Sequence, residues 1–410
     1  MKINRFTLAN GLRVVHSRDT ATAMVAVNTL YDVGARDESE DMTGMAHLFE
    51  HLMFGGSANV VDFDGALSAA GGVSNAWTSN DFTNFYDVLP AVNLETALWL
   101  ESDRMLQLAF SEKALEVQRS VVIEEFKQMC LNRPYGDLDH AFRALAYTRH
   151  PYRYPVIGKD FSHIEKVSQD DVRRWFYAHY APNNAVLAIC GNVEFGRVRE
   201  LVEKWYGDIP RREIAPRLYP AEPLPEAPRS VELSGDVPQT AINLAFPMAA
   251  YGKEGYFEAD LLSDVLANGQ SSRFYRRLLL GSEMFTEIDA AIWGSEEPGL
   301  FTVTAKLREK GSDAEQRAIE AINAELGRLR DVAVDSHELQ RCVNRLESNR
   351  TFSLLNYLSV AQTLAHAEMH GENPDAFMAP YRAITPESLQ SVARTIFNPS
   401  RAMTLVYRPV

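Results

Sequence analysis

Residues 44–54 read Gly-Met-Ala-His-Leu-Phe-Glu-His-Leu-Met-Phe, and this stretch decides how the rest of the chain is interpreted. Its apolar residues lie all round the turn of a helix, which predicts a short helix that is buried on most sides. Only three side chains in it are charged or titratable: His47, Glu50 and His51. Burying two imidazoles and a carboxylate is costly unless each is paired or bound to a metal ion.

The spacing of these three side chains favours a metal site. His47 and His51 are four residues apart, so both stand on one helical face and can donate to a single ion. Glu50 lies beside them and can reach a water molecule on that ion without being a ligand. The alternative is a pair of satisfied core histidines with a glutamate on the helix surface, because motifs this short also match by chance.

A third ligand has to come from elsewhere in the fold, because catalytic zinc takes three protein ligands and keeps one position open. The periodicity of residues 112–131 predicts a helix with an apolar face made by Leu115, Val122, Phe126 and Met129. Glu124 points away from that face, whereas Glu125 lies at its edge. Glu125 is therefore the expected third ligand, although glutamates on helices are usually solvated.

The order His-x-x-Glu-His reverses the common zinc motif His-Glu-x-x-His and marks the inverzincins. With Glu125 at this separation, the chain resembles the pitrilysin-type M16 metallopeptidases, a family that includes mitochondrial processing peptidase and insulin-degrading enzyme. The resemblance covers nearly the whole chain and is carried by further stretches: Leu8–Leu12, Gly71–Thr78, His150–Tyr152 with Gly158, and Gly269–Tyr275. The last of these is similar to the family's Gly-x-Ser-Ser-Arg motif.

The resemblance implies an α+β fold of two related roll domains, each an antiparallel-rich sheet flanked by helices. It implies one Zn²⁺ per chain, held by His47, His51 and Glu125, with Glu50 activating the attacking water. It also implies a closed chamber that admits peptides or unfolded segments. Active assemblies of the family contain four such domains, so a chain of this length needs a homologous partner subunit.

The expected substrate site is an edge strand. An extended peptide would add as a further strand beside Asn75, Ala76 and Trp77. An ordinary edge strand without a ligand is an equally good interpretation of that segment. Ser271 and Ser272 are interpreted as caps at the start of a helix, because no general base lies near them in sequence.

Two features, at three positions, depart from the family pattern. Gln118 stands seven residues before Glu125, where the family often has a glutamate that supports the metal site from behind the ligands. Leu279 and Thr286 stand where active assemblies usually have an Arg and a Tyr that hold the substrate backbone. Arg276 and Arg277 are nearby but wrongly spaced. We therefore expect a catalytic half that borrows the missing pair from another subunit, with a heterodimer favoured and a homodimer possible.

A proline-dense stretch divides the chain into halves of similar size. We expect a zinc-binding roll domain at 1–212, a linker at 213–229 and a second roll domain at 230–410, with a duplication plausible. Strands are expected in the first half at 4–16 (a hairpin through Asn10-Gly11), 22–33, 71–78 and 82–89. Helices are expected from a Thr43 cap to Gly55-Gly56, and at 62–70, 91–109 and 112–131. The second half should form strands at 230–233 and 240–246, and helices at 254–267, at 312–330 and from about Ser336.

The composition limits the partners and the compartment. A net charge of −14 argues against nucleic acid and anionic membranes as partners. Three scattered cysteines argue against a disulfide framework. No stretch is expected to form a signal peptide or a membrane span, so we expect a cytoplasmic location, or a periplasmic or organellar one if a leader has been removed.

The function that these observations predict is a zinc-dependent endopeptidase. The alternative is a non-catalytic or weakly active subunit of an M16-type heteromeric complex, although such members typically lose zinc ligands and the motif here is whole. A serine hydrolase is a weaker interpretation, because no Gly-x-Ser-x-Gly turn stands out.

Overall fold

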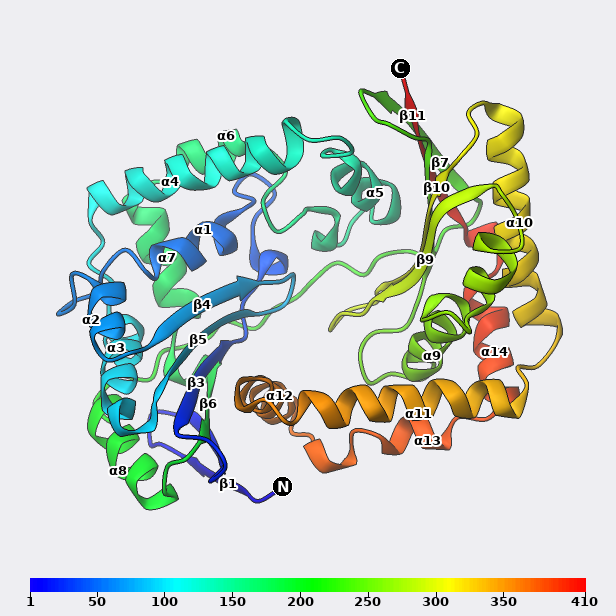
Figure 1. Cartoon of the computed structure of the whole chain (residues 1–410). Coiled ribbons are helices and arrows are strands. Elements are labelled where there is room, and N and C mark those ends of the chain that lie inside the picture. Colours follow the sequence, from blue (N-terminus) through cyan, green and yellow to red (C-terminus); the bar gives the residue numbers. More distant parts are fainter. The chain divides into compact units, whose positions relative to one another are not determined.

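The computed structural model describes residues 1–410 and divides into two compact units, each built on one β-sheet (Figure 1). The first unit comprises residues 1–127, 154–219 and 350–377, and the second comprises residues 128–153, 220–349 and 378–410. Two sheets flanked by helices make a mixed α and β fold, as the sequence predicts. The units interleave along the chain and do not follow a single cut at residues 213–229.

The first unit contains a six-stranded sheet in the order β1-β2-β6-β3-β5-β4. Its strands are β1 (Ile3–Thr7), β2 (Arg13–Arg18), β3 (Met24–Tyr31), β4 (Val73–Thr78), β5 (Thr83–Pro90) and β6 (Ala185–Gly191). Only β2 and β6 pair in parallel, and all other neighbours are antiparallel. β4 lies at one edge and pairs with β5 alone, which leaves its outer backbone free of strand partners.

Helices cover both faces of this sheet. The larger core lies under α1 (Met45–Leu52), α3 (Leu94–Leu106), α7 (Gln169–His179) and α8 (Phe195–Tyr206). α12 (Tyr357–His370) packs on the opposite face, against β2, β3 and β6 (Figure 1). Because it is covered on both sides, β6 is buried at every residue and has the unbroken run Ala-Val-Leu-Ala-Ile-Cys-Gly.

Three further helices complete the first unit: α2 (Phe63–Ala69), α4 (Glu112–Phe126) and α6 (Phe161–Lys166). α4 begins where Ser111 accepts a hydrogen bond from the backbone of Ala114. After Phe126 the helix widens into a π-helical segment, Lys127–Leu131, instead of continuing as an α-helix to residue 131.

The second unit has a five-stranded sheet in the order β7-β11-β8-β10-β9. Its strands are β7 (Arg229–Gly235), β8 (Ala241–Pro247), β9 (Phe285–Trp293), β10 (Leu300–Leu307) and β11 (Met403–Pro409). β7 and β11 are parallel and the other pairs are antiparallel, so this order repeats the β2-β6-β3-β5-β4 part of the first sheet. The shared order supports the duplication that weak sequence similarity left open.

The second unit contains α5 (Leu138–Ala146), α9 (Tyr256–Ala267), α10 (Ser312–Asp331), α13 (Ala379–Ala383) and α14 (Pro386–Ile396). α9 and α10 follow the predicted ranges closely, whereas α5, α13 and α14 were not predicted from the sequence. α9, α10 and α14 pack together, while α5 packs against β7 and β11 in a separate apolar cluster. The chain returns to the first unit along α11 (Ser336–Ser353).

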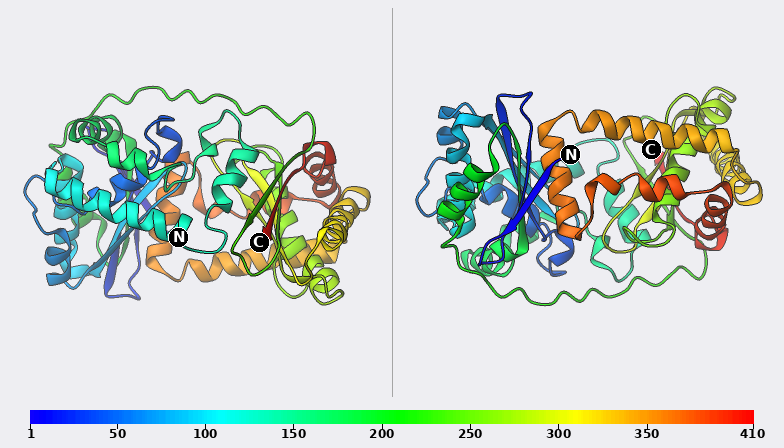
Figure 2. Two further views of the ribbon diagram at one scale, coloured as in Figure 1. Left: turned by 90° about the horizontal axis from the view of Figure 1, so that it is seen from above. Right: turned by 90° about the horizontal axis from the view of Figure 1, so that it is seen from below.

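The proline-dense segment before β7 contains neither helix nor strand and can be followed as an extended stretch in Figure 2. Its start is fixed to the first unit by Arg217, which forms an ion pair with Asp32 at 2.7 Å. In the second unit, Glu222 accepts hydrogen bonds from the backbone N–H groups of Thr148, Arg149 and His150.

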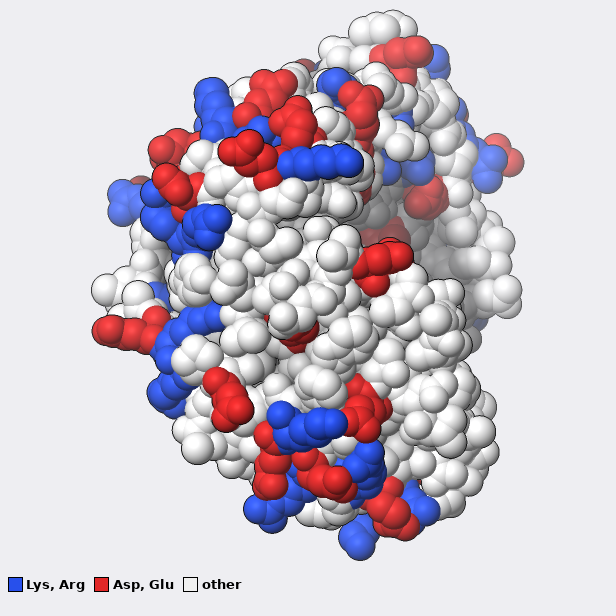
Figure 3. Space-filling view, turned by 90° about the vertical axis from the view of Figure 1, so that its left-hand side faces the viewer, with Lys and Arg blue, Asp and Glu red and all other residues white.

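The face of the first unit that carries α2 and α3 is uncharged over much of its middle, and charged side chains of both signs gather toward its two ends (Figure 3). Many of the charges on the helices of this unit are paired within one helix, as in Arg197 with Glu200 and Arg199 with Glu203 on α8. Such pairs are typical of solvated helix faces. No helix of the chain is both long enough and apolar enough to span a membrane.

Candidate metal and active site

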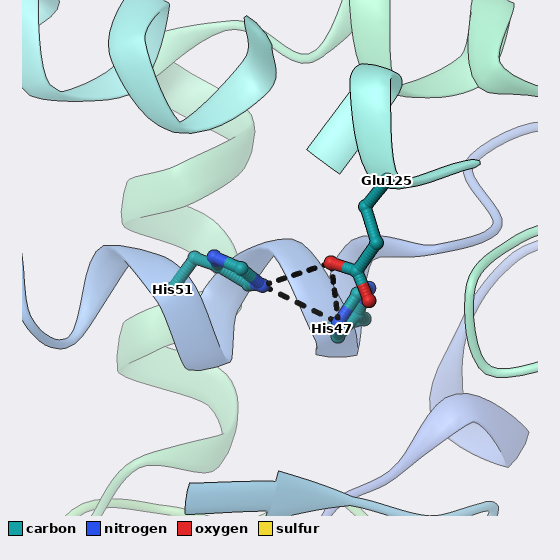
Figure 4. Close-up of side chains that lie close together, drawn as sticks. All are labelled: His47, His51 and Glu125. Carbon is teal, nitrogen blue, oxygen red and sulfur yellow. Dashed lines mark hydrogen bonds and ion pairs between the residues drawn. The ribbon is translucent and has the colours of Figure 1, made fainter. Parts of the chain in front are cut away.

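Three side chains from two helices of the first unit bring their donor atoms together (Figure 4). The Nε2 atoms of His47 and His51 on α1 lie 3.3 Å apart. Oε2 of Glu125 on α4 lies 3.7 Å from Nε2 of His47 and 3.6 Å from Nε2 of His51. The three donors therefore form a nearly equilateral triangle.

This triangle fits a zinc ion. Ligand atoms at about 2.0–2.2 Å in tetrahedral geometry lie roughly 3.3–3.6 Å from each other. The observed separations are close to that range, and two imidazoles with one carboxylate leave a fourth position open, as in catalytic zinc sites.

The electrostatics place two of the donors in the forms that a metal ion requires. Burial lowers the pKa of His47 to about 4, so the imidazole is neutral at neutral pH and has a free lone pair. The neighbouring imidazole of His51 lowers the pKa of Glu125, which keeps that carboxylate ionised. Metal binding needs neutral histidine and ionised carboxylate, so neither group has to lose a proton first.

Glu50 lies on the same helix, next to His51, and is not one of the three converging donors. Its carboxylate accepts a hydrogen bond from the hydroxyl of Thr78, at the end of β4. Burial raises the pKa of Glu50, and the bond from Thr78 acts in the opposite direction. A carboxylate with a raised pKa suits proton transfer near neutral pH.

The two neighbouring carboxylates of α4 have different surroundings. The side chain of Glu124 is 71% exposed and pairs with Lys127, whereas that of Glu125 is 34% exposed and faces α1. Leu115, Val122 and Phe126 form the predicted buried face. Met129 was wrongly assigned to that face and is 38% exposed, because the helix changes to π geometry after Phe126 and the direction of later side chains rotates.

Gln118, the expected support behind the ligands, is half-buried on α4 and makes no hydrogen bond to the three donor residues. Nδ1 of His47 is buried without a hydrogen-bond partner. The expectation that Gln118 supports the site stays a prediction.

The start of α1 differs from the expectation, because Thr43 does not cap it. Gly44 occupies the N-cap position with φ 86°, in the left-handed region that favours glycine. The hydroxyl of Thr43 instead lies 2.9 Å from Nδ1 of His163 and accepts a hydrogen bond from the backbone N–H of Lys159. The prediction that Thr43 caps α1 was wrong because its hydroxyl instead contacts His163 and Lys159.

A second glycine allows the chain to pack closely against the start of α1. Gly158 has φ 98°, and a Cβ atom there would lie 3.0 Å from the carbonyl oxygen of Thr43 and 3.2 Å from Cα of Gly44. This close approach gives a physical reason for Gly158 in the stretch that resembles the family.

The expected substrate strand, Asn75 to Trp77, lies in β4 at the edge of the first sheet. Asn75 and Trp77 point to the exposed side of the strand, whereas Ala76 packs against the core that contains α1. Thr78 ends the same strand and donates a hydrogen bond to Glu50, so the end of β4 lies beside the candidate base. Strand addition at β4 stays a prediction.

In the second unit, Leu279 ends a π-helical segment, Phe274–Leu279, and Thr286 lies at the start of β9. Arg277, near the place of the missing pair, forms an ion pair with the buried Glu325 at 2.9 Å.

Ser271 and Ser272 do not cap the helix that follows them. It begins after Arg273 without a side-chain cap, so that interpretation was wrong. The hydroxyl of Ser272 is buried without a hydrogen-bond partner. Arg273 pairs with Glu338 at 2.7 Å, which gives this arginine a structural contact.

The helix of the second unit that corresponds to α1 lacks the metal-binding residues. α9 also starts after a left-handed glycine, Gly255 with φ 89°. Counting from the two glycines, Glu258 and Leu262 stand in place of His47 and His51, and Leu261 in place of Glu50. α9 therefore cannot form a metal site of the kind that α1 can form with α4.

Comparison with known proteins agrees with this division. The family model "Insulinase (Peptidase family M16)" matches residues 13–159, and the model "Peptidase M16 inactive domain" matches residues 166–346. The zinc protease PqqE of Helicobacter pylori is 26% identical over 98% of this chain and 92% of its own length. YmxG of Bacillus subtilis, named an uncharacterized zinc protease, is 24% identical over 98% of both chains.

The same fold is found in solved structures. The crystal structure of a protease from Helicobacter pylori has a TM-score of 0.92 and 26% identity, over 100% of this chain and 99% of that chain. The candidate metal residues lie in the part matched by the M16 peptidase model, and the helix without them lies in the part matched by the inactive-domain model. The chain belongs to the M16 family of peptidases.

Proposed function

We propose that this chain is a zinc-dependent endopeptidase that cleaves peptides or unfolded segments, with one Zn²⁺ held by His47, His51 and Glu125. The observation that carries the proposal is the convergence of their donor atoms, 3.3–3.7 Å apart, beside Glu50. The names of relatives as zinc proteases support it.

The residues of the chain divide the chemistry between them. Bound zinc supplies a Lewis acid that polarises the scissile carbonyl and lowers the pKa of a coordinated water. Glu50 takes a proton from the attacking water and later gives it to the leaving amine. Thr78 orients Glu50 through its hydrogen bond.

The substrate is proposed to bind as an extended strand along β4. Backbone groups at a sheet edge can pair with any extended peptide, so they give affinity without demanding a sequence. Because most backbone groups of a folded segment are already hydrogen-bonded, the mode favours unstructured substrates, which a closed chamber would also select.

A second candidate is a weakly active or non-catalytic subunit of a heteromeric complex. It is favoured by one observation, the presence of Leu279 and Thr286 where an Arg and a Tyr are expected. The two candidates differ in whether the purified chain turns over substrate by itself.

The deciding experiment measures cleavage of an unstructured peptide library by the zinc-loaded chain and by Glu50→Gln. Zinc content and thermal stability should stay near the wild-type values in Glu50→Gln, while turnover falls by at least about 100-fold, the scale of general-base catalysis. Undiminished turnover would end the assignment of Glu50, and loss of zinc would make Glu50 a ligand. A wild-type chain that binds zinc but cleaves nothing would favour the second candidate.

A further inference from the structure

The first turn of α1 is capped by a side chain from outside the helix. The N-cap residue is Gly44, which has no side chain to offer. Oε2 of Glu38 accepts a hydrogen bond from the backbone N–H of Gly44, and Oε1 accepts one from that of Ala46, each at 2.8 Å. Both oxygens of one carboxylate therefore bind the turn that leads into His47.

The surroundings of Glu38 shield this cap from solvent. The residue is only 8% exposed, so water competes little for its oxygens. Burial raises the pKa of Glu38 to about 8, and the hydrogen bonds from Ala46 and Gly44 oppose that rise. The partial positive charge at a helix N-terminus also favours the ionised carboxylate.

The loop that carries Glu38 is anchored on the same unit. Asp37 accepts a hydrogen bond from the backbone N–H of Gly34 at 2.9 Å. It also accepts one from the hydroxyl of Tyr219 at 2.7 Å and pairs with Arg217 at 3.2 Å. Glu38 thus follows a residue whose position is fixed by three separate contacts.

The second unit gives an internal comparison. α9 starts after a left-handed glycine as α1 does, but Ala249 stands six residues before Gly255, where Glu38 stands before Gly44. α9 also lacks the metal-binding set. Within this chain, the carboxylate cap accompanies the helix with the histidines and is missing from the helix without them.

We propose that Glu38 is a positioning residue of the metal site, which fixes the first turn of α1 and thereby the direction of His47. His47 follows Ala46 directly, whereas His51 lies one turn further along. Fraying of the first turn would therefore displace one ligand and leave the other two in place, which weakens chelation. This inference rests on the proposed zinc site.

The variant that tests it is Glu38→Gln, which puts an NH₂ group where one acceptor oxygen stands. The matched control is Asp103→Asn, since Asp103 is a 6% exposed carboxylate of the same unit that accepts a hydrogen bond from the backbone N–H of Asn59. Zinc affinity, measured by chelator competition, should fall about tenfold in Glu38→Gln, as when a residue behind the ligands is lost. The control should stay within about twofold while losing comparable thermal stability.

A second measurement needs no metal. In the zinc-free protein, hydrogen exchange at the amides of Gly44 and Ala46 should be faster in Glu38→Gln and unchanged in Asp103→Asn. Unchanged exchange or unchanged zinc affinity in Glu38→Gln would overturn the inference, as would an equal loss of affinity in the control. A wild-type chain without zinc affinity would instead overturn the proposed function, and the exchange result would still decide whether Glu38 fixes α1.

Discussion

Two adjacent residues of α4 should respond very differently to the same substitution. Glu125→Gln removes an ionised donor from the triangle with His47 and His51, so most of the bound zinc should be lost. Glu124→Gln removes only an exposed ion pair with Lys127, which is worth little. Elemental analysis after dialysis measures both variants, and zinc retained in Glu125→Gln but lost in Glu124→Gln would show that the wrong carboxylate was assigned.

A buried histidine away from the metal site should make the fold sensitive to acid. Burial lowers the pKa of His179 to about 4, below the ordinary value of about 6.5 that applies after unfolding. The unfolded chain therefore binds the proton more readily, and stability present above pH 6.5 is lost as the pH falls toward 4, by up to about 3 kcal/mol. Asp37, Asp32 and Arg217 are the charges that act on this ring.

The test is thermal unfolding between pH 7 and pH 5. His179→Gln should lose less stability over this interval than the wild type, while His337→Gln, at the exposed start of α11, should follow the wild type. An identical decline in both variants would mean that other groups cause the acid sensitivity.

The metal residues could be proposed from the sequence because each depends on local helical geometry. The spacing of His47 and His51 places them on one face, and the apolar face of α4 orients Glu125. Glu38 and Thr78 gave no such signal, since their partners lie 6 to 28 residues away across loops and strands whose positions only the fold determines.

At the scale of elements, the close contact between the start of α1 and Gly158 should make a side chain at residue 158 destabilising. Gly158→Ala would combine a left-handed backbone with a Cβ atom 3.0 Å from a carbonyl oxygen, and should lower stability by about 1–3 kcal/mol. Gly196→Ala, in α8 with nothing within 4 Å, should raise it by about 0.5–1 kcal/mol. Chemical denaturation measures the free energy of unfolding of both variants. An unchanged value in Gly158→Ala would show that the backbone at Thr43 and Gly44 can move to make room for the added Cβ atom.

The elements that were predicted have strong sequence patterns, whereas β6, β9, β10 and β11 were not predicted. The hairpin through Asn10-Gly11 joins β1 and β2, and the strand expected at 22–33 forms β3. The π-helical turn after α4 was missed, since nothing in the pattern of Lys127–Leu131 separates it from an α-helix. The covering of each sheet by a distant helix was also missed, because apolar periodicity shows that a face is buried without showing against what.

At the scale of the whole molecule, activity is expected to depend on a partner. Leu279 and Thr286 offer neither a guanidinium nor a phenol for the substrate backbone, so the transition state would be poorly positioned in a dimer of identical chains. We predict low peptidase activity for the isolated chain, raised at least about tenfold by a homologous subunit with the Arg and Tyr. High activity of a pure homodimer on an unfolded peptide would contradict this, and would point to Arg276, Arg277 or another group.

The presence of two sheet-containing halves was predictable from the sequence, and the interleaving of the compact units was not. The Pro-rich segment marks the passage between the two sheets, as its composition indicates. Residues 128–153 nevertheless belong to the second unit, and residues 350–377 belong to the first. Tertiary packing determines this arrangement, and the composition of the two segments does not indicate it.

The interleaving has a consequence for biosynthesis. The chain passes between the units five times, after residues 127, 153, 219, 349 and 377. A ribosome that has made the first sheet and every candidate metal ligand has not yet made α12, whose Val360, Ala361 and Leu364 cover one face of that sheet. The first unit therefore keeps an apolar face of its sheet exposed to solvent until nearly the whole chain has been synthesised.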